Sequence, residues 1–291
     1  VDGPLSVEDM RVKMKVLDTF IDAAEEFGFP RRSDFNTGEN EGVGYFQVTQ
    51  RNGLRCSTAV GYLNPIKHRK NLKIITQAHI KNIEFENNKA VSVNYWQGNQ
   101  LKKVKANIEI ILSAGSIGSP HILQASGIGP GELLRKNNVE VIKDQPAVGK
   151  NLQDHLMLRP VYKIKNLDTL NEAYHSLIKK MFIGINYFIF RKGPLTMGAS
   201  HLCGFIKSDE YLETPNLQFH VSPMSTDILG QTTLHKFPAF TPTICNIKPT
   251  SKGSVELNGS DTRTDPKITM NYLSTPEDCE IAAKAIKITR K

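Results

Sequence analysis

The residues with the clearest chemical potential lie in a turn of small side chains, Ser113, Ala114, Gly115 and Ser116. The turn follows a short apolar run over 108–112 and precedes a predicted helix. A strand, a tight turn and a helix in this order present backbone N–H groups to the phosphates of a nucleotide. Small side chains let the backbone approach such a ligand closely. An ordinary strand-to-helix crossover without a ligand has the same spacing, so both interpretations stay open here.

The element after this turn is predicted to be a helix that begins at Ser119 and Pro120, as an N-cap followed by a proline in the first turn. Ile122 and Leu123 give the helix an apolar side, and 126–127 (SG) predict its end.

Two further groups of residues invite a chemical interpretation. Asp154 and His155 are adjacent and suggest acid–base chemistry, but a structural role for this histidine is favoured. The cysteines lie too far apart for a zinc-binding pattern, so no metal site is predicted. The four are Cys56, Cys203, Cys245 and Cys279.

The fifteen positions from Gly115 to Gly129, GSxxSPxILxxSGIG, resemble the second signature of the glucose–methanol–choline (GMC) flavoenzyme oxidoreductases. The resemblance extends over nearly the whole chain. Within the family, the sequence is most similar in character to insect glucose dehydrogenases. The other matching segments are 51–59 (RNGLRCSTA), 149–155 (GKNLQDH), 249–255 (PTSKGSV, with Lys252 where Arg is usual), 266–268 (PKI) and 271–273 (NYL).

This resemblance implies an α/β plus α+β fold in two parts. Residues 1–150 would form an incomplete FAD-binding, Rossmann-like domain that carries an antiparallel meander. Residues 151–291 would form part of a substrate domain with a mostly antiparallel sheet flanked by helices.

The resemblance also implies FAD as the cofactor. It places the main chain of Ile80 at the adenine end of FAD, and the turn residues Ser113, Ala114 and Gly115 beside the cofactor. Taken without the resemblance, Ile80 is a core strand residue, and both interpretations can hold.

The activity implied by the resemblance is FAD-dependent oxidation of the CH–OH group of a small alcohol or sugar. The GxGxxG motif with which the family begins is absent, and the HPxGT-like segment and later base of the family have no counterpart before Lys291. We therefore expect this chain to correspond to the middle part of such an enzyme. We assign no catalytic residue and expect the isolated chain to be inactive. The alternative is a truncated or degenerate protein with a binding role or none.

The composition is that of an ordinary globular protein, with 39% hydrophobic and 23% charged residues in 291. The net charge of +8 favours anionic ligands or surfaces. The densest basic cluster is 67–70 (KHRK), but no aromatic interleaving or nucleic-acid motif accompanies it, so no nucleic-acid partner is expected. The residues do not indicate a compartment, and the resemblance points to secretion.

The turn at 113–116 is expected to sit at the end of a parallel sheet. Apolar runs at 72–76 and 108–112 predict two neighbouring parallel strands. Between them, three alternating segments predict an antiparallel meander, because Asn87-Asn88 and Gly98-Asn99 are typical hairpin connectors. The three segments are 79–85, 90–96 and 101–106.

Later segments predict further helices and strands. A helix is expected over 171–190, and its apolar run 181–190 is too short to cross a bilayer, which needs about 20 residues. A buried helix is favoured, and a face on a membrane surface is the alternative. The polar loop 223–238 is expected to border a substrate cavity. The expected strands are 43–50, 139–142, 161–164, 202–206, 217–221, 243–247, 254–257 and 267–270.

Overall fold

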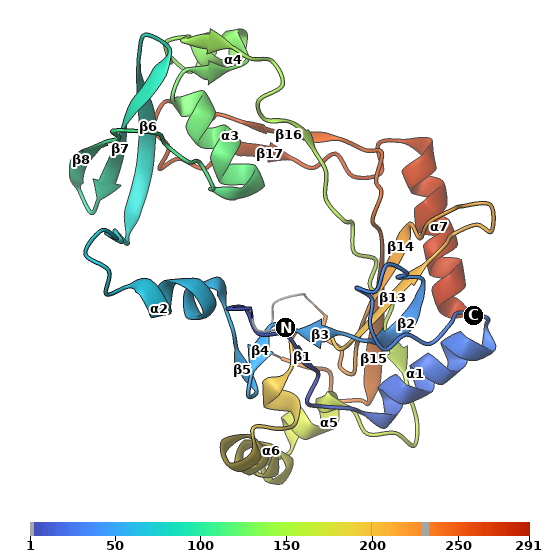
Figure 1. Cartoon of the computed structure of the whole chain (residues 1–291). Helices are drawn as coiled ribbons and strands as arrows, with labels where there is room; N and C mark the ends of the chain where they lie inside the picture. The colour runs from blue at the N-terminus through green and yellow to red at the C-terminus, as the bar shows by residue number, and fades with distance from the viewer. Residues whose placement is uncertain (1–2, 199, 228–232) are drawn as a thin grey trace. The chain divides into compact units, whose positions relative to one another are not determined.

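The computed structural model describes residues 3–198, 200–227 and 233–291, which form two compact units (Figure 1). Each unit is assembled from separate pieces of the chain. The first unit combines 1–72, 155–248 and 279–291, and the second combines 73–154 and 249–278. The expected division near residue 150 concerns the functional domains of the family and stays a prediction.

A five-stranded antiparallel sheet forms the centre of the first unit, as the sequence predicted for the later part of the chain. Burial alternates strictly along Leu217–Ser222, because successive side chains point to opposite faces of the sheet. In spatial order the strands are β12 (Tyr162–Lys163), β15 (Ala239–Asn246), β14 (Leu217–Ser222), β13 (Leu202–Ile206) and β2 (Gly42–Tyr45).

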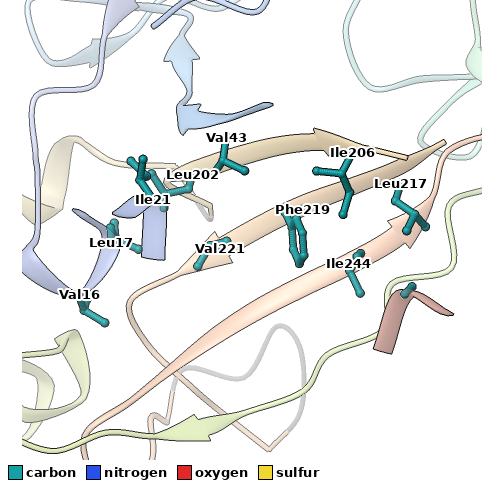
Figure 2. Close-up of a cluster of buried hydrophobic side chains, with 11 residues drawn as sticks. Val16, Leu17, Ile21, Val43, Leu202, Ile206, Leu217, Phe219, Val221 and Ile244 are labelled. Carbon is teal, nitrogen blue, oxygen red and sulfur yellow. The ribbon is translucent and has the colours of Figure 1, made fainter. Parts of the chain in front are cut away.

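Helix α1 (Lys15–Glu26) covers one face of this sheet and forms the core with it (Figure 2). Leu17 and Ile21 on the helix pack against strand residues such as Leu202, and all three side chains are at most 3% exposed. Burying each of these side chains contributes about 1.5–3 kcal/mol to folding. The C-terminal part of α7 (Pro276–Arg290) joins the cluster through Ala285.

Apart from the 14-residue helix α6, the remaining elements of the first unit are short. The hairpin of β4 and β5 turns through Asn52 and Gly53, both at positive φ (53° and 71°), a conformation that an Asn-Gly pair favours. The elements are β1 (Glu8–Asp9), β3 (Gln47–Val48), β4 (Gln50–Arg51), β5 (Leu54–Arg55), the π-helix η1 (Ala59–Leu63), α2 (Asn64–Ile66), α5 (Leu170–His175), α6 (Leu177–Phe190) and the 3-10 helix η2 (Pro194–Thr196).

The prediction of one buried helix over 171–190 is wrong in two respects. Ser176 has an extended backbone and separates α5 from α6, and its hydroxyl caps α6 by accepting from the N–H of Lys179. No residue of α6 is buried. The apolar composition of a helix predicts that its side chains favour burial, but it does not predict which element they pack against. In the described chain α6 meets α5 and η2, and its outer face stays exposed.

The antiparallel meander of the second unit is confirmed. Its strands are β6 (Ala78–Glu86), β7 (Lys89–Gln97) and β8 (Gln100–Lys105), paired in that order. Asn87 and Asn88 turn the first hairpin with φ of 50° and 62°, which asparagine tolerates better than other side chains.

Around the meander, the second unit contains two helices and five short strands. Strands β11 (Lys150–Leu152), β16 (Gly253–Glu256) and β17 (Lys267–Thr269) form an antiparallel sheet, and β9 (Ile128–Gly129) pairs in parallel with β10 (Lys143–Asp144). The helices are α3 (Gly115–Ala125) and α4 (Gly131–Lys136).

Three local predictions for the second unit are wrong. The runs 72–76 and 108–112 form no strands, because a strand needs a hydrogen-bonded neighbour and neither run finds one in the described chain. Several of their apolar side chains are exposed, 50% for Ile74 and 83% for Ile108. The strand expected at 139–142 is found instead at 143–144, where it pairs with β9.

Candidate cofactor-binding site

The turn predicted to contact a cofactor is exposed. Ser113, Ala114 and Gly115 are exposed and lead directly into the 11-residue helix α3. Gly115 has a φ of +79°, and nothing lies within 4 Å of the position that a Cβ would occupy there. The N–H of Ala114 donates to the hydroxyl of Ser119 at 3.1 Å, which ties the turn to the helix. The turn therefore offers small residues and open space to a ligand.

Helix α3 begins at Gly115, so the predicted start at Ser119 and Pro120 is wrong. Pro120 lies inside the helix. Because proline has no N–H, the carbonyl of Ser116 lacks its usual helical donor. The first N–H groups of any helix lack helical partners and carry a partial positive charge. With the helix starting one turn earlier, these groups stand directly beside the small-residue turn, which favours an anionic ligand such as a phosphate.

Ile80, the other predicted cofactor contact, lies on β6 opposite Tyr95 and is half-buried. Its carbonyl oxygen accepts a hydrogen bond from the hydroxyl of Thr262 at 2.8 Å. The carbonyl of Thr262 lies 2.8 Å from Nε2 of the neighbouring His79. A carbonyl oxygen has two lone pairs and can accept a second hydrogen bond. The register of β6 also shifts immediately after Ile80.

The structure holds α3 against the strand that carries Ile80. The hydroxyl of Ser126, at the end of α3, accepts from the N–H of Ile83 at 2.8 Å and donates to the carbonyl of Ile122 at 2.5 Å. Both predicted contact regions thus belong to elements that pack on each other. Neither the Ser126 link nor the Thr262 link was predicted, because each joins segments far apart in the sequence.

Gln124 connects α3 to the rest of the second unit. Its side chain is fully buried; the amide nitrogen donates to the carbonyls of Val148 (3.2 Å) and Val255 (3.0 Å). Its oxygen accepts from the N–H of Leu257 at 2.7 Å. Gly149 passes so close that a Cβ there would lie 2.4 Å from this amide nitrogen. The C-terminal half of the helix that follows the turn is therefore fixed by two separate segments, 148–149 and 255–257.

Asp154 makes a structural contact in the second unit. Its carboxylate accepts a hydrogen bond from the hydroxyl of Tyr272, and this bond, together with burial, raises the pKa of Tyr272. In the first unit, burial and then the charge of His155 lower the pKa of His220.

Neither metal-ligand clusters nor membrane-spanning helices occur in the part of the chain that the structure describes. No three His, Cys, Asp or Glu side chains there gather closely enough to hold a metal ion. No described helix combines the length and apolar character that a membrane crossing requires.

The comparison with protein families decides the assignment. The N-terminal model of the family described as GMC oxidoreductase matches residues 1–157, and its C-terminal model matches residues 249–291. The chain belongs to the GMC oxidoreductase family. The family resemblance inferred from the 115–129 signature is thereby confirmed.

Curated relatives of this GMC oxidoreductase chain include an alcohol dehydrogenase [acceptor] from Pseudomonas putida, 37% identical over 99% of the chain and 52% of the relative. An oxygen-dependent choline dehydrogenase from Pectobacterium atrosepticum is 35% identical over 99% of the chain and 52% of its own length. The chain spans about half the length of the curated relatives it matches. The narrower similarity to insect glucose dehydrogenases stays a prediction.

Solved structures confirm the mixed α/β fold of the GMC chain, with its several antiparallel sheets. The pyridoxine 4-oxidase of Mesorbium loti aligns with a TM-score of 0.82 and 25% identity, covering 99% of this chain and 53% of that structure. A formate oxidase aligns with a TM-score of 0.88 and 22% identity, covering 99% of this chain and 55% of that structure, and shows the fold alone. No comparison tests the individual contacts at Ile80, Ser113, Ala114 and Gly115, which stay predictions.

Proposed function

We propose that the protein containing this chain is an FAD-dependent oxidoreductase that acts on the CH–OH group of small alcohols. The match of both GMC family models, at the two ends of one chain, carries the proposal. The accessible turn before α3 supports it, because the turn offers open space and helix N–H groups to an anionic cofactor.

In this proposal the chain binds and orients the cofactor. Backbone N–H groups at the start of α3 contact the cofactor, and Ser113, Ala114 and Gly115 allow it to approach because their side chains are small. The main chain of Ile80 contacts the adenine end, and Thr262 and Ser126 keep β6 and α3 in place. When bound, the flavin supplies the acceptor for the hydride that leaves the donor carbon.

The proposed donor is a small alcohol, since the curated relatives are named for alcohol and choline. A sugar donor follows from the narrower resemblance to glucose dehydrogenases, and we include it in the test. The panel is a primary aliphatic alcohol, choline and glucose, each added anaerobically to the purified full-length protein while the flavin absorbance is recorded. Bleaching of the flavin bands by at least one donor is expected. A flavin that stays oxidised with every donor would contradict the assignment as an oxidoreductase.

Cofactor binding has its own test. Gly115→Val adds a branched side chain to the turn, and we expect FAD affinity to fall at least about tenfold, or about 1.4 kcal/mol. Gly98→Val is the matched control, because both glycines have positive φ and open space around the missing Cβ. Titration with FAD, followed by flavin fluorescence, measures both variants. A colourless protein that binds no added FAD, or equal affinities for the two variants, would remove the turn from the proposed site.

A further inference from the structure

Helix α6 presents an unbroken apolar face outside the proposed cofactor site. At about 100° per residue, seven of its side chains fall within an arc of about 140°. All seven are exposed, from 45% for Ile185 to 82% for Leu177. We call this face the α6 stripe; it consists of Leu177, Ile178, Met181, Phe182, Ile185, Phe188 and Ile189.

The opposite side of α6 faces the protein. Ile183, Gly184, Asn186 and Tyr187 are half-buried there, and α6 meets α5 and η2. The orientation of the helix is therefore set by its own packing, with the α6 stripe turned outward. Single exposed apolar residues are common on proteins, but seven contiguous ones on one helix face indicate a binding surface.

Basic residues border the α6 stripe at both ends. Lys179 and Lys180 lie in the first turn, and Arg191 and Lys192 follow the last residue of the helix. The sequence from 173 to 208 contains no aspartate or glutamate. Lys179 pairs with Asp168 at 3.1 Å, a contact between two exposed side chains that competes only weakly with other anions. The segment that carries the stripe thus has an excess of positive charge.

We propose that the α6 stripe docks on the surface of an anionic lipid bilayer. A short helix with leucine and phenylalanine on one face, bordered by lysine and arginine, is the pattern of an interfacial membrane helix. Its 14 residues rise only about 21 Å, so the helix lies along the interface and does not cross a hydrocarbon core of about 30 Å. A protein partner fits less well, because the face offers no polar atom for the hydrogen bonds that protein interfaces carry.

Flotation with vesicles tests this proposal on the full chain, independently of FAD. Vesicles of phosphatidylcholine with 30% phosphatidylglycerol are compared with vesicles of phosphatidylcholine alone. Phe182→Ser combined with Phe188→Ser disrupts the stripe. Tyr211→Ser is the matched control, since Tyr211 is an exposed aromatic residue elsewhere in the first unit. Lys192→Glu tests the charge, with Lys105→Glu on β8 as the control that alters net charge equally.

We expect binding to the anionic vesicles, at least tenfold weaker binding after the double substitution or Lys192→Glu, and unchanged binding in both controls. Absence of binding to the anionic vesicles overturns the proposal. The proposal is also overturned if the double variant binds anionic vesicles as strongly as the unchanged protein, because the net charge alone would then account for binding. If sedimentation instead shows a dimer that the double substitution converts to a monomer, and no vesicle binding, the stripe is a contact between two copies of the chain. Unchanged circular dichroism establishes that each variant is folded.

Discussion

The hydroxyl of Ser126 accepts a hydrogen bond from the backbone N–H of Ile83 at 2.8 Å, and this bond joins the end of α3 to β6. Ile83 is 6% exposed and Ser126 is 4% exposed, so water cannot replace the bond in the folded chain. A single side chain thereby adds a hydrogen bond to the packing of the helix that follows the proposed cofactor turn on the strand that carries Ile80.

Ser126→Ala is expected to destabilise the folded chain by about 1–3 kcal/mol, because the buried N–H of Ile83 loses its acceptor. Chemical denaturation measures the effect. Ser260→Ala, an exposed serine of the same unit, is the control and should change stability by less than about 0.5 kcal/mol. Equal effects of the two substitutions would show that the bond contributes nothing to stability.

Gly149→Ala is expected to cost at least about 3 kcal/mol. Gly149 has a φ of +82°, and an added Cβ would lie 2.1 Å from the carbonyl oxygen of Val255 and 2.4 Å from Nε2 of Gln124. Gly98 also has a positive φ, but its surroundings are open. Gly98→Ala therefore measures backbone strain alone, about 1 kcal/mol. Thermal unfolding of both variants separates crowding from strain, and similar melting temperatures would contradict the close approach at Gly149.

Two isoleucines on different helices test which faces are buried. Ile21 on α1 is 3% exposed and Ile178 on α6 is 66% exposed. Ile21→Ala should cost about 2–5 kcal/mol through the lost contacts and the cavity left in the core. Ile178→Ala should change stability by less than about 0.5 kcal/mol. Denaturation midpoints report both values, and a large loss for Ile178→Ala would mean that the α6 stripe is covered in solution.

The stability of the first unit should depend on pH through His201. Its side chain is fully buried, and burial lowers the pKa of the imidazole to about 4. The ordinary value is near 6.5, so the unfolded chain binds the proton more tightly than the folded chain. The stability that the folded chain gains by keeping His201 neutral is fully present above a pH of about 6.5. It is lost as the pH falls toward 4, and the loss in the free energy of unfolding reaches about 3 kcal/mol.

His201→Gln should flatten this pH dependence, whatever its effect on stability at neutral pH. The measurement is the free energy of unfolding at several pH values between 7.5 and 4.5. His68→Gln, at an exposed position, is the control for removing a histidine. An unchanged slope in the His201→Gln variant would contradict the assignment.

Local sequence signals predicted local structure well. The predicted connector Asn87-Asn88 adopts the positive φ values that tight hairpins need, and the meander forms with the expected order. The 115–129 signature led to the right family. These features depend on residues close in the sequence, so their patterns are visible without a structure.

Features that depend on a distant partner could not be predicted. The runs 72–76 and 108–112 have strand-like composition, but composition does not supply the neighbour that a strand pairs with. The apolar residues of α6 predicted burial, yet the helix packs through its opposite side. The links from Ser126 to Ile83 and from Thr262 to Ile80 span 43 and 182 residues, and no local pattern announces them.

The hydrogen-bond partners of Gln124 determine when the second unit can finish folding during synthesis. Two of them, the carbonyl of Val255 and the N–H of Leu257, lie 131 and 133 residues downstream. While a ribosome elongates the chain, α3 and the meander emerge long before these partners exist. The second unit therefore completes its fold only after most of the first has been synthesised. In a nascent chain that stalls before residue 255, the Gln124 amide has only the carbonyl of Val148 as a partner.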